Sequence, residues 1–229
     1  MRKYLEGKFI NNVIELFVSE DLRERECLKT ILHRVYGRFM SMRFCIRALI
    51  ANMCYRTIYG DRTENGIPEF LEIFCSIIHG FTVPVKKEHK QFLRTVLIPL
   101  HKYPYLEKFH EQLVACCVRF VLKDPTIGPM FWPVRSPSKE EMFIAEVANV
   151  INAMINDSNE LRIKPHQQIL FGVIDQLVRC MKSKHHSVAE RAILIWSEEA
   201  MEILVDMDKA STWPKIIAAF IEVEKLSFV

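Results

Sequence analysis

The chain has 229 residues, of which 50% are hydrophobic and 26% are charged. This length buries a substantial core, and the near balance of 31 basic and 28 acidic side chains excludes both a disordered chain and a basic tail for nucleic acid. The seven glycines form no phosphate-loop pattern, which excludes nucleotide binding through the common glycine-rich loops.

The seven cysteines contain no C-x-x-C pair and are mostly flanked by apolar residues. This pattern indicates reduced thiols in a hydrophobic core. No secretory segment follows Met1, and no apolar run approaches the length of a membrane span. We therefore expect a protein of the cytoplasm or the nucleus, without membrane insertion.

Apolar residues recur at spacings of three and four along almost the whole chain, which is typical of helices. The first stripe runs from Phe9 to Phe17, the second from Leu28 to Phe39 and the third from Ile46 to Cys54. Further stripes cover residues 67–78, 89–100, 106–122, 142–155, 169–181, 188–204 and 213–223. The sequence predicts about ten helices and no strands.

Ten helices with short connections make either a compact bundle or a stack of helix pairs. A short internal match, LKTIL at 28–32 and LRTVL at 93–97, favours the stack. We predict an all-α, HEAT-like helical-repeat solenoid of about five antiparallel pairs, each of roughly 40 residues, in a single domain over residues 1–229. Prolines at every fourth position predict an irregular connection at about 125–137.

No catalytic constellation is visible. The histidines form no H-E-x-x-H motif, no G-x-S-x-G motif is present, and Cys116-Cys117 lies within an apolar stripe. We expect a noncatalytic protein without metal or cofactor. A solenoid that carries nucleic acid or a basic cargo signal is the rival from another class, and the small net charge of +3 argues against it.

A basic stripe is the most informative feature. It consists of Lys29, His33, Arg34, Arg38, Arg43 and Arg47, with Tyr36 among them. Spacings of four make one face of a helix pair cationic. A second cluster, over residues 86–90, places cations at a helix start, where they oppose the macrodipole. Such placement points to a ligand, and the alternative is a solvated charged face.

The segments around this stripe belong to a recognisable pattern. SEDLRERE at 19–26, LKT at 28–30 and LHRVYGRF at 32–39 closely resemble the B-prime family of regulatory subunits of protein phosphatase 2A. Further matching segments follow in order: NGI at 65–67, EI at 72–73, SII at 76–78, GF at 80–81, EHK at 88–90, PLHK at 99–102 and SVAERA at 187–192. The resemblance implies a HEAT-like solenoid and covers the middle portion of the family core.

The resemblance also implies a function. Members of the family contact the scaffold and catalytic subunits of the phosphatase and recruit substrate or adaptor proteins, whose short Leu-x-x-Ile-x-Glu motifs lie in a groove between repeats. It assigns His33, Arg34, Arg43 and Arg47 to the acidic or phosphorylated part of the motif, Thr30, Tyr36, Ile73, Ile77 and His89 to the apolar anchors, and Lys29 and Lys86 to the rim. An alternative is a truncated adaptor that binds the same motifs without assembling with the phosphatase.

An acidic loop precedes the basic helix. The resemblance implies that Glu20, Asp21, Glu24 and Glu26 face phosphatase partners. The alternative is that these residues only supply favourable charge at a helix N-terminus. Leu22 stands where the family usually has proline.

Overall fold

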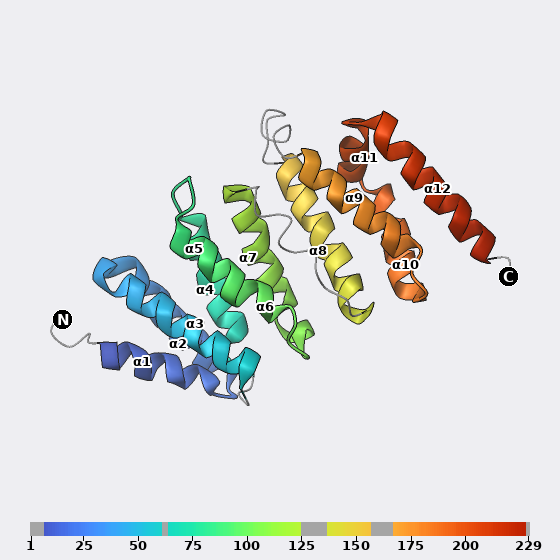
Figure 1. The fold of residues 1–229 in the computed structure, drawn as a ribbon. Coiled ribbons are helices and arrows are strands. Elements are labelled where there is room, and N and C mark those ends of the chain that lie inside the picture. Colours follow the sequence, from blue (N-terminus) through green and yellow to red (C-terminus); the bar gives the residue numbers. More distant parts are fainter. Residues whose placement is uncertain (1–6, 61–63, 125–136, 157–166, 228–229) are drawn as a thin grey trace. The chain divides into compact units, whose positions relative to one another are not determined.

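The computed structural model describes residues 7–60, 64–124, 137–156 and 167–227, and these ranges contain helices and turns but no strand (Figure 1). This confirms the all-α prediction. The contacts divide the chain into two compact units, residues 1–119 and 120–229. The single domain over 1–229 stays a prediction, and each unit is described by itself.

The first unit is built from helical hairpins. Its helices are α1 (Gly7–Glu15), α2 (Leu22–Arg38), α3 (Arg43–Tyr59), α4 (Ile67–His79), α5 (Lys87–Phe92), α6 (Ile98–Leu100) and the greater part of α7 (His110–Lys123). A π-helical turn over Leu93–Leu97 joins α5 to α6 without a break. Short 3₁₀ turns follow α1, α2 and α6.

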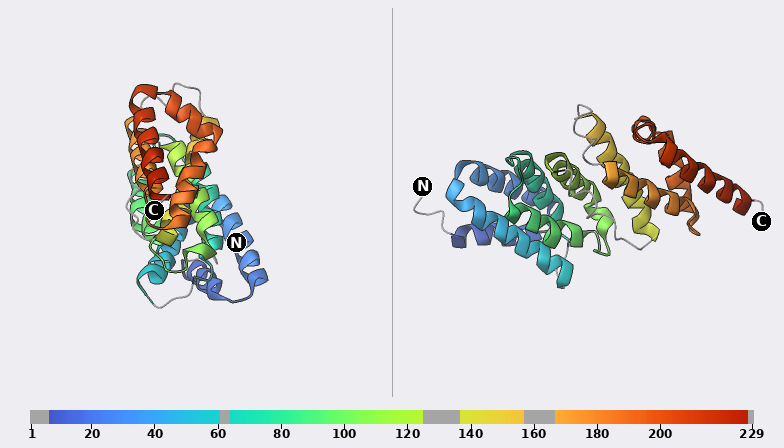
Figure 2. Two further views of the ribbon diagram at one scale, coloured as in Figure 1. Left: turned by 90° about the vertical axis from the view of Figure 1, so that its right-hand side faces the viewer. Right: turned by 45° about the horizontal axis from the view of Figure 1, so that its top comes forward.

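Helices of the first unit stack in two layers. α1 packs on α3, and α3 packs on the π-helical turn and α6, whereas α2 packs on α4. α7 continues the second layer, since the Cys116 thiol lies 3.1 Å from the carbonyl oxygen of Leu71 in α4. Each helix thus packs on the next helix of its own layer, which is typical of helical-repeat solenoids (Figures 1 and 2).

Long-range hydrogen bonds reveal the length of the repeat. Side-chain bonds such as those of Arg25 with Glu69, Arg56 with Glu15 and Asn152 with Glu198 join residues 44, 41 and 46 positions apart. These separations agree with the predicted repeat of roughly 40 residues.

Local chemistry sets where the helices of the first unit begin. Asp21 caps α2, because its carboxylate accepts a hydrogen bond of 2.8 Å from the backbone N–H of Arg23. Gly66 precedes α4 with a φ of 85°, and a Cβ at this position would lie 2.7 Å from the Cβ of Phe17. The ring of Phe17, in the 3₁₀ turn after α1, packs on the ring of Phe70 with centroids 4.4 Å apart. This turn therefore packs against the start of α4.

The second unit contains α8 (Pro137–Asn156), α9 (Gln167–Met181), α10 (His186–Leu194), α11 (Glu199–Asp206) and α12 (Lys209–Ser227). α8 packs on α10 and α11, and α9 packs on α10 and α12. The predicted continuous stripe over 188–204 is interrupted, since a 3₁₀ turn over Ile195–Ser197 separates α10 from α11.

Two further predictions concern connections and repeats. Of the proline-spaced segment at 125–137, residues 125–136 lie outside the described residues, and Pro137 is the first residue of α8. LKTIL lies in α2 and LRTVL in the π-helical turn, which belong to different layers, so this match does not mark equivalent positions of two repeats.

Among the described helices, none combines the length and apolar character that crossing a membrane requires.

Candidate functional site

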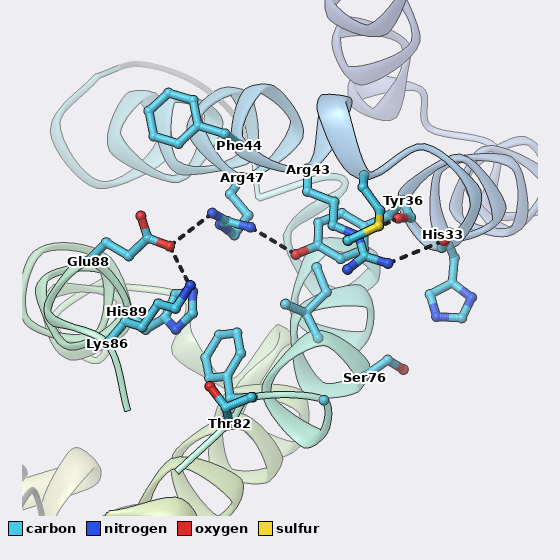
Figure 3. A pocket seen from close by; sticks show the side chains of 15 residues that line it. His33, Tyr36, Arg43, Phe44, Arg47, Ser76, Thr82, Lys86, Glu88 and His89 are labelled. Carbon is cyan, nitrogen blue, oxygen red and sulfur yellow. Dashed lines mark hydrogen bonds and ion pairs between the residues drawn. The ribbon is translucent and has the colours of Figure 1, made fainter. Parts of the chain in front are cut away.

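A surface groove of about 480 Å³ opens where α2 ends, α3 begins, α4 ends and α5 begins (Figure 3). We call it the α2–α5 groove. Among the residues that line it are these predicted site residues: His33, Tyr36, Arg43, Arg47, Ile77, Lys86 and His89. Stacked hairpins therefore bring together side chains that lie far apart in the sequence.

Arg43 closes the end of α2 on one side of the groove. Its Nε donates to the carbonyl oxygen of Tyr36 at 3.0 Å, and its Nη2 donates to that of Gly37 at 3.2 Å. The guanidinium lies 5.3 Å from the centroid of the Tyr36 ring. A cation at a helix C-terminus and over an aromatic ring is favourable on both counts, so these contacts hold Arg43 at the groove.

Arg47 is one of three cations that line the groove, together with Arg43 and Lys86. Its Nη1 donates to the Tyr36 hydroxyl at 3.0 Å, and its Nη2 donates to Glu88 Oε1 at 3.2 Å. The guanidinium thus lies between a ring from α2 and a carboxylate from α5, as Figure 3 shows. One nitrogen of the Arg47 guanidinium is therefore already paired with Glu88, a carboxylate of the protein itself.

His89 lines the groove from α5, next to Lys86. Its ring stacks on Phe81 with centroids 3.7 Å apart and an interplanar angle of 1°, and its Nε2 lies 3.2 Å from Glu88 Oε1. Burial is the main cause that lowers the pKa of His89, and the cations of Arg47 and Lys86 lower it further against the opposing charge of Glu88. The imidazole is therefore neutral near pH 7.

The groove also has an apolar part. Ile77 is buried in its floor beside the half-buried Phe81. Met40 and Phe44 stand at its edge with 74% and 71% of their surface exposed. Large apolar side chains left exposed next to cations are typical of surfaces that bind a ligand with both kinds of group.

Some predicted site residues are not among the described residues that line the groove. Ile73 is buried in the core of α4, and Lys29 pairs with Glu26 and Glu72. Thr30 donates through its hydroxyl to the carbonyl oxygen of Glu26 at 3.1 Å. Arg34 is exposed on α2, one residue from the groove-lining His33. The binding roles of these four residues, like those of the seven that line the groove, stay predictions.

The predicted acidic loop is only partly a loop, because α2 begins at Leu22 and already contains Glu24 and Glu26. Hydrogen bonds from Arg23 lower the pKa of Asp21, the cap of α2. Glu24 bonds to Ser19, and Glu26 pairs with Lys29.

Arg25 anchors the same loop. Its guanidinium donates to the carbonyl oxygens of Ser19 at 2.7 Å and Glu20 at 3.1 Å, and also to the buried Glu69 at 2.7 Å. These contacts support the helix N-terminal reading for Asp21, and contact of the loop with phosphatase partners stays a prediction.

Sequence reasoning missed several residues of the groove: Gly37, Met40, Phe44, Ser76, Gly80, Phe81, Thr82 and Glu88. Phe81 and Glu88 belong to the GF and EHK segments that carry the family resemblance. The available signal for Phe44 was a large apolar residue directly after Arg43 in a cationic stretch.

Comparison with known proteins supplies the family. Residues 1–226 match the family model described as "Protein phosphatase 2A regulatory B subunit (B56 family)". The chain is 41% identical over 225 residues to the B-prime eta isoform of the 59 kDa regulatory subunit of serine/threonine protein phosphatase 2A from Arabidopsis thaliana, covering 95% of this chain and 43% of that protein.

Two animal proteins give similar values. Identity is 40% over 233 residues to pptr-1, a protein phosphatase 2A regulatory subunit of Caenorhabditis elegans, with 98% of this chain and 41% of the relative covered. It is 39% over 231 residues to the alpha isoform of the human 56 kDa regulatory subunit, with 98% and 46% covered. The chain spans less than half the length of these relatives, all of which are named regulatory rather than catalytic subunits. It belongs to the B56 family of protein phosphatase 2A regulatory B subunits.

Proposed function

We propose that this chain is a noncatalytic regulatory subunit of protein phosphatase 2A that recruits substrate or adaptor proteins by binding Leu-x-x-Ile-x-Glu-type motifs in the α2–α5 groove. The observation that carries the proposal is the meeting of Arg43, Arg47 and Lys86 with the apolar Ile77 and Phe81 in one open groove. In its assembled form the chain contacts the scaffold and catalytic subunits.

The three cations that line the groove suit the acidic end of such a motif. An arginine presents a planar fork of donors that matches a carboxylate or a phosphate. Glu88 is the acidic group among the described residues that line the groove, so the cations of Arg43, Arg47 and Lys86 outnumber it. Arg34, exposed beside His33, extends the positive surface along α2.

The apolar part suits the leucine and isoleucine of the motif. These two side chains are three positions apart, so an extended ligand separates them by about 10 Å. Ile77, the Phe81–His89 stack and the exposed Met40 and Phe44 offer apolar surface on different sides of the groove. The volume of about 480 Å³ is that of a site for a few side chains rather than for a folded domain.

Tethering is the proposed mechanism. A substrate held by its motif near a catalytic subunit meets the active site at a high effective concentration, so dephosphorylation becomes nearly intramolecular. No group in the groove has to react. We place the protein in the cytoplasm or nucleus, in keeping with seven cysteines, all described, that form no disulfide.

A fluorescence anisotropy titration with a labelled Leu-x-x-Ile-x-Glu peptide tests the groove. We expect Arg47→Ala to weaken binding by about tenfold or more, because the ligand carboxylate loses a desolvated partner. Arg38→Ala is the matched control, since Arg38 is exposed on α2 but is not among the described groove residues. Equal losses from the two substitutions would contradict the groove.

A second measurement tests assembly separately. The chain, immobilised through a tag, is mixed with purified scaffold and catalytic subunits, and the retained phosphatase activity is measured. Retention supports the regulatory role. Peptide binding without retention would identify the adaptor that binds motifs but does not assemble with the phosphatase.

A further inference from the structure

A second cavity, of about 560 Å³, lies between α4 and α7 in the first unit. Its titratable lining residues are His33, Glu72, Cys75, His79, Glu111 and Arg119. His33 and Ser76 also line the α2–α5 groove, so the two cavities are neighbours. A half-exposed cysteine in a cavity with this many charged groups has no role in the proposed motif binding.

Arg119 is directed at the sulfur of Cys75. Its Nε donates to Cys75 Sγ at 2.9 Å, and its Nη1 lies 3.1 Å from His79 Nδ1. A guanidinium in hydrogen-bonding contact with a sulfur stabilises the thiolate, which is the reactive form of cysteine. Because Cys75 is half-exposed, a small reagent that enters the cavity reaches this sulfur.

A second thiol lies behind the first. The buried Cys116 of α7 donates to the carbonyl oxygen of Leu71 at 3.1 Å, and Leu71 lies one helical turn before Cys75 on α4, so the two thiols are neighbours. The adjacent Cys116 thiol, together with the hydrogen bond and charge of Arg119, lowers the pKa of Cys75 to about 6, against burial and the charge of Glu72. Burial raises the pKa of Cys116 well above its usual value. At neutral pH, negative charge therefore resides on Cys75 and a proton on Cys116.

We propose that Cys75 and Cys116 are a peroxide-responsive thiol pair that closes a disulfide between α4 and α7. The Cys75 thiolate attacks one oxygen of a hydroperoxide, the O–O bond breaks, and hydroxide or alkoxide leaves. The sulfur, now a sulfenic acid, has lost two electrons to the peroxide. The Cys116 sulfur then attacks Cys75, the S–S bond forms, the S–O bond breaks, and the hydroxyl group leaves with the Cys116 proton as water.

The other cysteines provide the comparison. Cys54, Cys117 and Cys180 are buried, and burial raises the pKa of Cys54 to about 12. Cys27 on α2 is exposed, so it measures what accessibility alone contributes. If exposure decided reactivity, Cys27 would be oxidised before Cys75, and the proposed pair requires the reverse order.

The test treats the purified chain with limiting hydrogen peroxide, blocks remaining thiols with an alkylating reagent and maps peptides without reduction by mass spectrometry. We expect a linked Cys75–Cys116 peptide pair before oxidation of Cys27. In Cys116→Ser, the sulfenic acid on Cys75 persists and is trapped by dimedone. Arg119→Gln, an exposed position, slows Cys75 oxidation by about tenfold with unchanged helicity by circular dichroism.

Three results would overturn the proposed pair. They are the absence of a linked Cys75–Cys116 peptide, oxidation of Cys27 as fast as that of Cys75, and a rate of Cys75 oxidation in Arg119→Gln equal to that in the unsubstituted chain. The first two are read in the unsubstituted chain, so they do not depend on whether a variant folds. The readout contains no motif peptide, and its failure would leave the proposed function of the groove untouched. Formation of the disulfide would tie α4, which carries Ser76 and Ile77 of the groove, covalently to α7.

Discussion

Arg47 and Glu88 face each other across the α2–α5 groove, with Nη2 3.2 Å from Oε1. They come from α3 and α5 and are 41 positions apart. Glu88 is the more exposed partner, with 48% of its side-chain surface accessible against 20% for Arg47. An incoming carboxylate therefore competes with a carboxylate of the protein for the same guanidinium.

This competition predicts the effect of Glu88→Gln. We expect the affinity for an acidic motif peptide to rise by about two- to fivefold, because the ligand no longer displaces a charged partner of Arg47. Anisotropy titrations measure the change. Glu107→Gln, at an exposed acid on the 3₁₀ turn after α6, serves as the control and should leave affinity unchanged. A weaker complex with Glu88→Gln would mean that Glu88 positions Arg47 for the ligand instead.

Arg34 provides a test that is separate from the fold. Its side chain is exposed, and no ion pair of Arg34 is found within the described part of the chain. We expect Arg34→Ala to weaken the motif peptide by about tenfold or more, because an uncommitted guanidinium pairs with the ligand acid at little cost. Circular dichroism should show the same helicity. Equal affinity of both proteins would remove Arg34 from the site.

His89 makes stability depend on pH. The folded state holds its pKa below the usual 6.5, so the unfolded state binds a proton more readily between the two values. The free energy of unfolding is unaffected by this group above pH 6.5 and falls as the pH drops through 6.5 toward the folded pKa. We expect His89→Gln to lose part of this acid sensitivity.

Urea denaturation of both proteins at about pH 8 and about pH 5.5 measures the difference. The other histidines contribute equally to the two proteins, so the comparison isolates His89. An identical drop in both would show that burial of this imidazole does not oppose its protonation.

Gly66 predicts a large loss of stability on a small substitution. An alanine at φ 85° is strained, and its Cβ would lie 2.7 Å from the Cβ and 2.9 Å from the carbonyl oxygen of Phe17. We expect Gly66→Ala to lower the free energy of unfolding by about 2–4 kcal/mol. Gly37→Ala in α2 is the matched control, since nothing lies within 4 Å of its added Cβ, and it should stabilise by about 0.5–1 kcal/mol. Comparable effects at both glycines would refute this packing.

The buried pair of Arg25 and Glu69 predicts a non-additive effect. The side chains are only 14% and 3% exposed and lie 2.7 Å apart, so Arg25→Met leaves a buried carboxylate without its cation. We expect a loss of about 3–5 kcal/mol, most of which Glu69→Leu recovers in the double variant. At the more exposed Arg56–Glu15 pair, Glu15→Gln should cost at most about 1 kcal/mol. Additive losses at Arg25 and Glu69 would contradict a desolvated pair.

The helices could be predicted from the sequence because their apolar stripes repeat at helical spacing. The third stripe, from Ile46 to Cys54, falls within α3, and its first member is fully buried. Details that depend on local geometry could not be predicted. The π-helical turn over Leu93–Leu97 lies within one predicted stripe, and the 3₁₀ turn over Ile195–Ser197 divides another.

Less of the groove could be predicted from the sequence than of the helices. His33 and Tyr36 could be associated because they lie on one helix, and the family resemblance added Ile77 and His89. Contacts such as Arg47 with Glu88 or Arg119 with Cys75 join positions 41 and 44 residues apart. Periodicity identifies the face of each helix but not its partner on the next hairpin, so these pairs became visible only with the stacking.

Contacts that reach about forty positions along the chain make each hairpin dependent on its immediate neighbours alone. A residue added to a loop lengthens a connection and leaves the ion pairs between hairpins in place. A residue deleted inside α2 or α4 rotates every later side chain of that helix by about 100° and presents the wrong face to the next layer. The hairpin is therefore the smallest length of chain that such an architecture can gain or lose with its interior intact.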